Sequence, residues 1–187
     1  MSPLLVGLVG SCRSGADRQA PPPPPPAIEV RDATGAVTAR VVPGRPCRAT
    51  IGDLELLVGG RPLVAQQGTV RWTGEDAANG TTLFKDGAPA ARYHARQLFD
   101  AEGLPLLRVL EDGSIADRAS AIVRRAAVAP PAAAGSGSAA TAGAVTIGNA
   151  TVTGTTDVVL AAMLASPEAP PAVRALVACH LLLPEVR

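Results

Sequence analysis

The stretch Phe99-Asp-Ala-Glu-Gly-Leu-Pro-Leu-Leu-Arg-Val109 decides what kind of fold this chain can adopt. The Asp100 side chain can accept hydrogen bonds from the backbone of its own turn, and Gly103 can take the positive φ that closes the turn. After the turn, two-residue alternation places Leu107 on one face and Arg108 on the opposite face. The stretch therefore predicts a tight turn that leads into an antiparallel β-strand.

The same turn recurs along the chain between residues 28 and 128. A glycine or serine is followed five positions later by an arginine, and in most copies an aspartate precedes it by three positions. These copies contain Asp32, Gly35 and Arg40; Gly87 and Arg92; Asp100, Gly103 and Arg108; and Asp117, Ser120 and Arg125. A weaker copy runs from Gly60 to Ala65. Because one hairpin cannot bury its apolar face alone, the repetition indicates hairpins that stack side by side into one structure.

This pattern predicts a mainly β domain over residues 28–128, in which antiparallel repeated hairpins form a shallow barrel or a sandwich. The turns recur at uneven spacings of 25, 27, 16 and 17 residues, and the barrel is the architecture that a family resemblance, given below, implies. An ordinary β-sandwich with several tight turns stays open as the alternative, because tight turns connect the strands of both architectures.

The C-terminal part is expected to complete this domain with helices. Residues 129–143 are rich in Ala, Gly, Ser and Pro, which is typical of a flexible loop. Residues 144–153 contain many β-formers and predict a strand or a hairpin. The stretch 158–165 is apolar on every side and indicates a buried helix, and a second helix carries His180 on its apolar stripe. We expect this helical hairpin to pack on the β domain or inside it.

The amino terminus indicates export and a lipid anchor. Val9-Gly10-Ser11-Cys12 follows an apolar run and resembles the bacterial lipobox, in which small residues precede the cysteine that receives diacylglycerol. The resemblance implies lipid attachment at Cys12 and removal of residues 1–11, which form a truncated signal without its basic start. Residues 12–27 end in a run of prolines and predict an extended tether of about 3.1 Å per residue. We therefore expect the protein at the cell envelope, on the outer membrane or a periplasm-facing membrane surface.

A second resemblance concerns the β domain. Residues 99–109 and the stretch Asp112-Gly-Ser-Ile-Ala-Asp117 resemble the β-flower family, which consists of shallow pseudosymmetric barrels of short antiparallel hairpins. Many members of that family are lipidated bacterial proteins. The resemblance implies a barrel and supplies no catalytic residue.

The remaining cysteines are candidates for a structural link. If Cys12 carries lipid, Cys47 and Cys179 are the two thiols left in the chain, and disulfides persist in exported proteins. Such a bridge would tie the last helix to the start of the β domain. The alternative is that Cys179 is a small buried hydrophobic residue.

The arginines of the repeat are candidates for a binding site. Arg40, Arg92, Arg108 and Arg125 occupy equivalent positions, so a pseudosymmetric barrel would arrange them in a positive ring that binds an anionic group. The alternative is a solvated outer face whose charge the turn aspartates balance.

Composition limits the classes of function. The net charge of +1 and the aromatic content of 2% argue against a nucleic-acid partner. The two histidines show no metal-ligand spacing, and the chain has neither a P-loop nor a G-x-S-x-G elbow, so we expect no metal, no cofactor and no catalytic residues.

We therefore expect a non-enzymatic, lipid-anchored protein that displays a β domain for a structural or binding role. The membrane is its partner through the lipid, and an envelope protein or an anionic glycan is the further partner that we expect. One alternative is an envelope hydrolase or carbohydrate-processing module whose site is assembled from distant residues. The other is a soluble cytoplasmic interaction domain whose first residues are not a signal.

Overall fold

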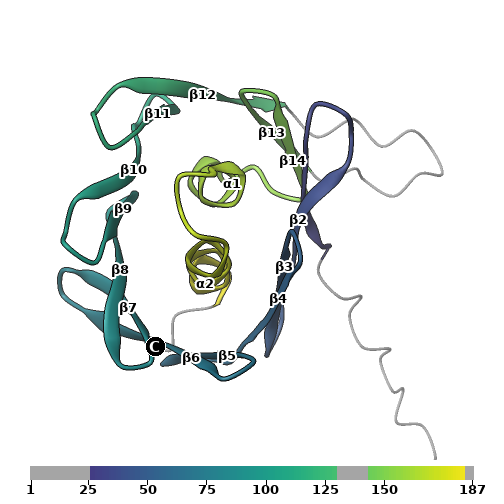
Figure 1. Cartoon of the computed structure of the whole chain (residues 1–187). Coiled ribbons are helices and arrows are strands. Elements are labelled where there is room, and N and C mark those ends of the chain that lie inside the picture. Colours follow the sequence, from purple (N-terminus) through teal and green to yellow (C-terminus); the bar gives the residue numbers. More distant parts are fainter. Residues whose placement is uncertain (1–25, 130–142, 184–187) are drawn as a thin grey trace, which may run out of the picture.

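Short antiparallel strands joined by tight turns form the wall of the molecule. The computed structural model describes residues 26–129 and 143–183, and all strands of this part belong to one sheet that curls into a nearly closed barrel (Figure 1). The predicted mainly β fold of repeated hairpins is confirmed, as a barrel and not a sandwich. The strands are β1 (Ile28–Arg31), β2 (Val37–Val42), β3 (Cys47–Ile51), β4 (Leu54–Val58), β5 (Leu63–Gln67), β6 (Val70–Ala77), β7 (Gly80–Lys85), β8 (Ala88–His94), β9 (Gln97–Asp100), β10 (Pro105–Val109), β11 (Ser114–Ala116), β12 (Ile122–Ala129), β13 (Ala144–Ile147) and β14 (Ala150–Thr153).

Most strands pair with their neighbours in sequence, and two places in the wall depart from this rule. β1 pairs with β14, so the hairpin of residues 144–153 connects β1 to β12 within the same sheet. Between β4 and β5, the ladder among the described residues consists of a single bridge, Gly59 with Val64. The barrel is therefore continuous everywhere except at the β4–β5 seam.

The predicted aspartate turns share one hydrogen-bond pattern. In each, the carboxylate accepts the backbone N–H four residues later: Ala36 N–H to Asp32 (3.1 Å), Leu104 N–H to Asp100 (2.8 Å) and Ala121 N–H to Asp117 (3.1 Å). The third residue after each aspartate has the expected positive φ: Gly35 at 85°, Gly103 at 81° and Ser120 at 61°. The weaker copy at Gly60 lies in the turn between β4 and β5, but the φ of Gly60 is not positive, so this copy does not form the same turn as the others.

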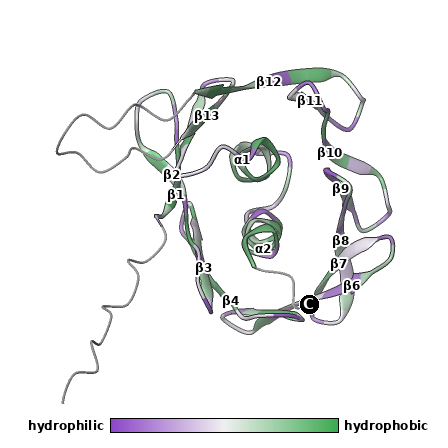
Figure 2. Ribbon diagram, turned by 180° about the vertical axis from the view of Figure 1, so that it is seen from behind, coloured by the Kyte–Doolittle hydropathy of each residue, from purple (hydrophilic) through white to green (hydrophobic). Residues whose placement is uncertain are grey.

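Two helices occupy the interior of the barrel: α1 (Val158–Ala165) and α2 (Pro171–Leu182). The side chain of Asp157 caps α1 by accepting the backbone N–H groups of Val159 and Leu160. Residues 160–164 are all buried, as the apolar character of this stretch predicted. Figure 2 shows both helices, largely hydrophobic, enclosed by the ring of strands.

A disulfide connects the wall to the interior. Cys47 on β3 and Cys179 on α2 are bonded, with their Cα atoms 5.8 Å apart, and both residues are fully buried. The pairing expected from the cysteine count is therefore present in the structure. It ties the helical pair to the side of the barrel next to the β4–β5 seam.

Candidate functional site

The candidate site residues predicted from the sequence do not form one site. Cys12 and its tether lie outside the described residues. The four arginines are spread over β2, β8, β10 and β12, on different sides of the barrel (Figure 1). Arg40, Arg92 and Arg108 each adjoin a buried residue of their strands, and Arg125 lies between the partly buried Arg124 and Ala126, so all four side chains belong to the outer face of the wall.

Three of these arginines have local contacts that account for them. Arg40 lies 3.7 Å from the Glu29 carboxylate, and Arg125 lies 3.7 Å from that of Asp112. The Arg92 guanidinium stacks over the Phe99 ring, 4.8 Å from its centroid. Because the side chains face outward around the circumference, the structure does not gather them on one anion. The arrangement agrees with the alternative interpretation of these arginines, which was a solvated outer face.

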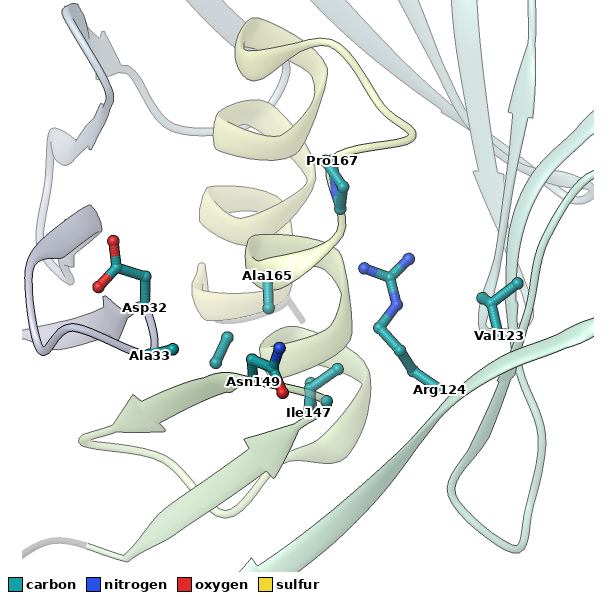
Figure 3. A pocket seen from close by; sticks show the side chains of 10 residues that line it. Asp32, Ala33, Val123, Arg124, Ile147, Asn149, Ala165 and Pro167 are labelled. Atoms are coloured by element: carbon teal, nitrogen blue, oxygen red, sulfur yellow. The ribbon is translucent and has the colours of Figure 1, made fainter.

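A pocket of about 550 Å³ lies at one end of the barrel. This open pocket is lined by the β1–β2 turn, β12, the β13–β14 turn and the end of α1, with Asp32, Asn149 and Arg124 as its polar lining (Figure 3). Ala165 and Pro167 contribute to its apolar lining. No histidine, cysteine or lysine belongs to this lining.

Arg124 is the charged residue that shapes this pocket. Arg124 precedes the outward-facing Arg125 on β12. Because adjacent side chains of a strand point to opposite faces, Arg124 faces inward. There it forms an ion pair with Glu168, which lies in the connection between α1 and α2. Arg174 on α2 donates to the Leu164 carbonyl at the end of α1. Burial lowers the pKa of the Arg174 guanidinium. The negative charge of Glu168 raises this pKa, but by less than burial lowers it. Glu168 thus forms an ion pair with Arg124, and its charge also acts on Arg174 at this end of the barrel.

Asp32 on the facing wall is already engaged in its turn. Hydrogen bonds from the Thr34 hydroxyl and backbone N–H lower the pKa of this carboxyl, so it stays ionised at neutral pH. The pocket therefore presents a carboxylate on one side and a guanidinium on the other. This arrangement suits a small polar ligand with both donor and acceptor groups.

A second polar cluster lies beside α2. The Asp76 carboxylate on β6 accepts from Arg61 at 2.8 Å and from the Thr81 hydroxyl at 2.7 Å, and Thr81 Oγ1 lies 3.1 Å from His180 Nε2. Since the hydroxyl has one proton and donates it to Asp76, the contact with His180 requires a hydrogen on Nε2. His180 is therefore not oriented to act as a base toward the Thr81 hydroxyl, and Thr81 is only 4% exposed. The cluster links β6, the β4–β5 connection and α2.

Sequence reasoning missed Arg124 and the Asp76 cluster, although it expected His180 on an apolar stripe. The available signal for Arg124 was the Arg124-Arg125 pair, because alternation must send one of two adjacent side chains inward. Its partner Glu168 is 44 residues away, and no local pattern connects them.

Comparison with family models, curated proteins and solved structures finds no match to this chain. Within residues 26–129 and 143–183, no group of three histidine, cysteine, aspartate or glutamate residues is placed to hold a metal ion. No helix in this described part is long and apolar enough to cross a bilayer.

Proposed function

We propose that this protein is a lipid-anchored component of the bacterial cell envelope whose barrel has a non-enzymatic binding role. The observation that carries the proposal is the bond between Cys47 and Cys179. A buried disulfide is typical of proteins that fold outside the cytosol. Because the chain has three cysteines, this pairing leaves Cys12 alone in its lipobox-like sequence.

The pocket beside Arg124 supports the binding role. It opens at one end of a barrel whose interior is filled by α1 and α2, so a ligand would bind at the rim and not in the lumen. Its lining offers hydrogen-bonding and charged groups on two walls, together with apolar surface. These features favour recognition of a small polar ligand or of a polar group on an envelope partner.

The experiment is intact-mass analysis of the protein extracted from membrane fractions, with free thiols alkylated under denaturing, non-reducing conditions. We expect a chain that begins at Cys12 and carries several acyl groups, because one chain alone binds a membrane only marginally. Cys47 and Cys179 should escape alkylation. The matched variant Cys12→Ala should move to the soluble fraction, and its continued retention in membranes would contradict the anchor.

A further inference from the structure

One wall of the Arg124 pocket carries more positive than negative charge. In the part of the chain that the structure describes, Glu168 is the one acidic residue that pairs with Arg124, and its charge is also the one that raises the pKa of Arg174. Two guanidinium groups against one carboxylate leave a net positive charge. The Nε atoms of both arginines are buried and have no hydrogen-bond partner among the described residues. This wall therefore retains capacity for a second anionic group.

The surroundings of Arg124 hold its side chain in place. A Cβ atom on Gly148 would lie 3.4 Å from Cγ and Cδ of Arg124, so the aliphatic part of the side chain packs against the β13–β14 turn. Figure 3 shows the guanidinium extending from β12 toward Pro167. The side chain is 18% exposed, and a charge is felt more strongly at such a partly desolvated place than on an open surface. Arg124 is therefore a preorganised contact for an anionic group of a ligand.

The other side of the pocket carries a negative charge without a cationic partner. Asp32 is ionised, as described above, and no cationic side chain within the described part of the chain forms an ion pair with it. Its neighbour Arg31 pairs with Glu29 instead. Asn149 lies between Asp32 and Arg124 in Figure 3, and its amide can both donate and accept hydrogen bonds. The pocket lining thus offers a negative, a neutral polar and a positive group in turn.

We infer that this pocket binds a small zwitterion. The carboxylate of the ligand would pair with Arg124, its ammonium group with Asp32, and the Asn149 amide would bind the polar atoms between them. A free amino acid and a short peptide with free ends share this chemistry. The volume of about 550 Å³ is in the range of small-molecule sites. The zwitterion would be the ligand of the proposed binding role, on which its assignment rests, whereas the lipid anchor plays no part in it.

The two charged walls disfavour other classes of polar ligand. A purely anionic compound would meet the Asp32 carboxylate, and a purely cationic one would meet Arg124, and like charges brought together cost free energy. A neutral sugar would take water away from both charged groups without replacing it by an opposite charge. A ligand with one charge of each sign satisfies both walls.

The test is isothermal titration calorimetry of the purified full chain with alanine, with trialanine and with three capped forms of trialanine. We expect a C-terminal amide, which removes the carboxylate, to raise the Kd about tenfold or more. N-terminal acetylation removes the ammonium group and should raise the Kd about threefold, because Asp32 is less buried than Arg124. The peptide with both caps should bind most weakly. The Kd values of alanine and uncapped trialanine distinguish an amino acid from a peptide as the source of the zwitterion.

Two pairs of variants locate the charges. Arg124→Gln should raise the Kd of the uncapped ligand about tenfold and abolish the effect of the amide, whereas Arg125→Gln, on the outer face, should leave the Kd within about twofold. Asp32→Asn should abolish the effect of acetylation, since asparagine keeps an oxygen that accepts the hydrogen bonds of the turn. Asp117→Asn makes the same change in an equivalent turn away from the pocket and should leave the Kd within about twofold.

Circular dichroism establishes that each variant is folded. If Arg124→Gln is unfolded, the double variant Arg124→Gln/Glu168→Gln replaces it, because it removes the ion pair without leaving a carboxylate unpaired. Equal effects of Arg124→Gln and Arg125→Gln would overturn the inference, as would the absence of saturable binding by both alanine and trialanine. Equally tight, Arg124-dependent binding of the doubly capped peptide would also overturn it but would leave the proposed binding role standing. The anchor is tested separately by the mass of the membrane-extracted chain.

Discussion

The seam between β1 and β14 and the seam between β4 and β5 close the same wall in different ways. β1 and β14 lie far apart in sequence, yet they pair at three positions, whereas β4 and β5 are consecutive and share one bridge. α1 packs near the first seam, and α2 packs against β3, β4 and β5 near the second. The disulfide and the Asp76 cluster both lie on the α2 side. Where the ladder is missing, a covalent bond and partly exposed polar contacts connect the wall to the core.

The largest expected effect comes from removing the disulfide. Cys47 and Cys179 are 132 residues apart, and the chain-entropy model assigns a closed loop of this size about 4–5 kcal/mol of unfolding free energy. The double variant Cys47→Ala/Cys179→Ala should lose most of this amount in urea unfolding. Reduction of the wild type should lower the midpoint to a similar extent. An unchanged midpoint would show that the bond does not compensate for the open seam.

The closed seam depends on a glycine. Gly154 follows β14 with φ at 88°, and a Cβ atom there would lie 2.4 Å from the Ala27 carbonyl oxygen, just before β1. Gly154→Ala should therefore cost about 2–4 kcal/mol, since backbone must move in addition to the strained φ. Thermal or urea unfolding measures this loss.

Gly103→Ala is the matched control for this prediction. Gly103 has a similar φ of 81°, but a Cβ atom there would have nothing within 4 Å. The control should lose only about 1 kcal/mol, the cost of the backbone conformation alone. Equal losses in the two variants would mean that close packing between β14 and β1 does not matter.

Local chemistry made much of the fold predictable. The Asp32, Asp100 and Asp117 turns follow from side-chain hydrogen bonds that span four residues, so the sequence pattern identified them, including the positive φ at Ser120. The apolar stretch 158–165 likewise predicted a buried helix, and residues 160–164 are buried. The cysteine count supported the pairing of Cys47 with Cys179.

The missed features are those that depend on distant partners. Nothing in residues 28–31 indicates that β1 pairs with β14, because any apolar strand can pair with any other in a suitable register. The same holds for Arg124 with Glu168. The arginine repeat was visible but misleading as a site, since equivalence along the sequence does not bring outward-facing side chains together.

A smaller effect tests the polar contacts that support the open seam. Burial raises the pKa of the Asp76 carboxyl, but the Thr81 hydrogen bond and the charges of His180 and Arg61 outweigh it and hold the pKa below the ordinary 3.8. A lowered pKa in the folded state contributes stability above the ordinary value, and this is lost as pH falls through the folded pKa. Asp76→Asn should therefore be less stable than wild type at neutral pH. A difference that did not shrink in acid would argue against the carboxylate as its source.

The comparison between the seams is tested most directly by amide hydrogen exchange of the free wild-type protein. At the closed seam, the alternation directs the N–H groups of Thr151 and Thr153 to β1, so we expect them to exchange slowly. Glu55, Leu57 and Gln66 should exchange on the order of 100-fold faster, because their N–H groups face an open edge. Equal protection at both seams would show that the β4–β5 seam is closed and would contradict the account.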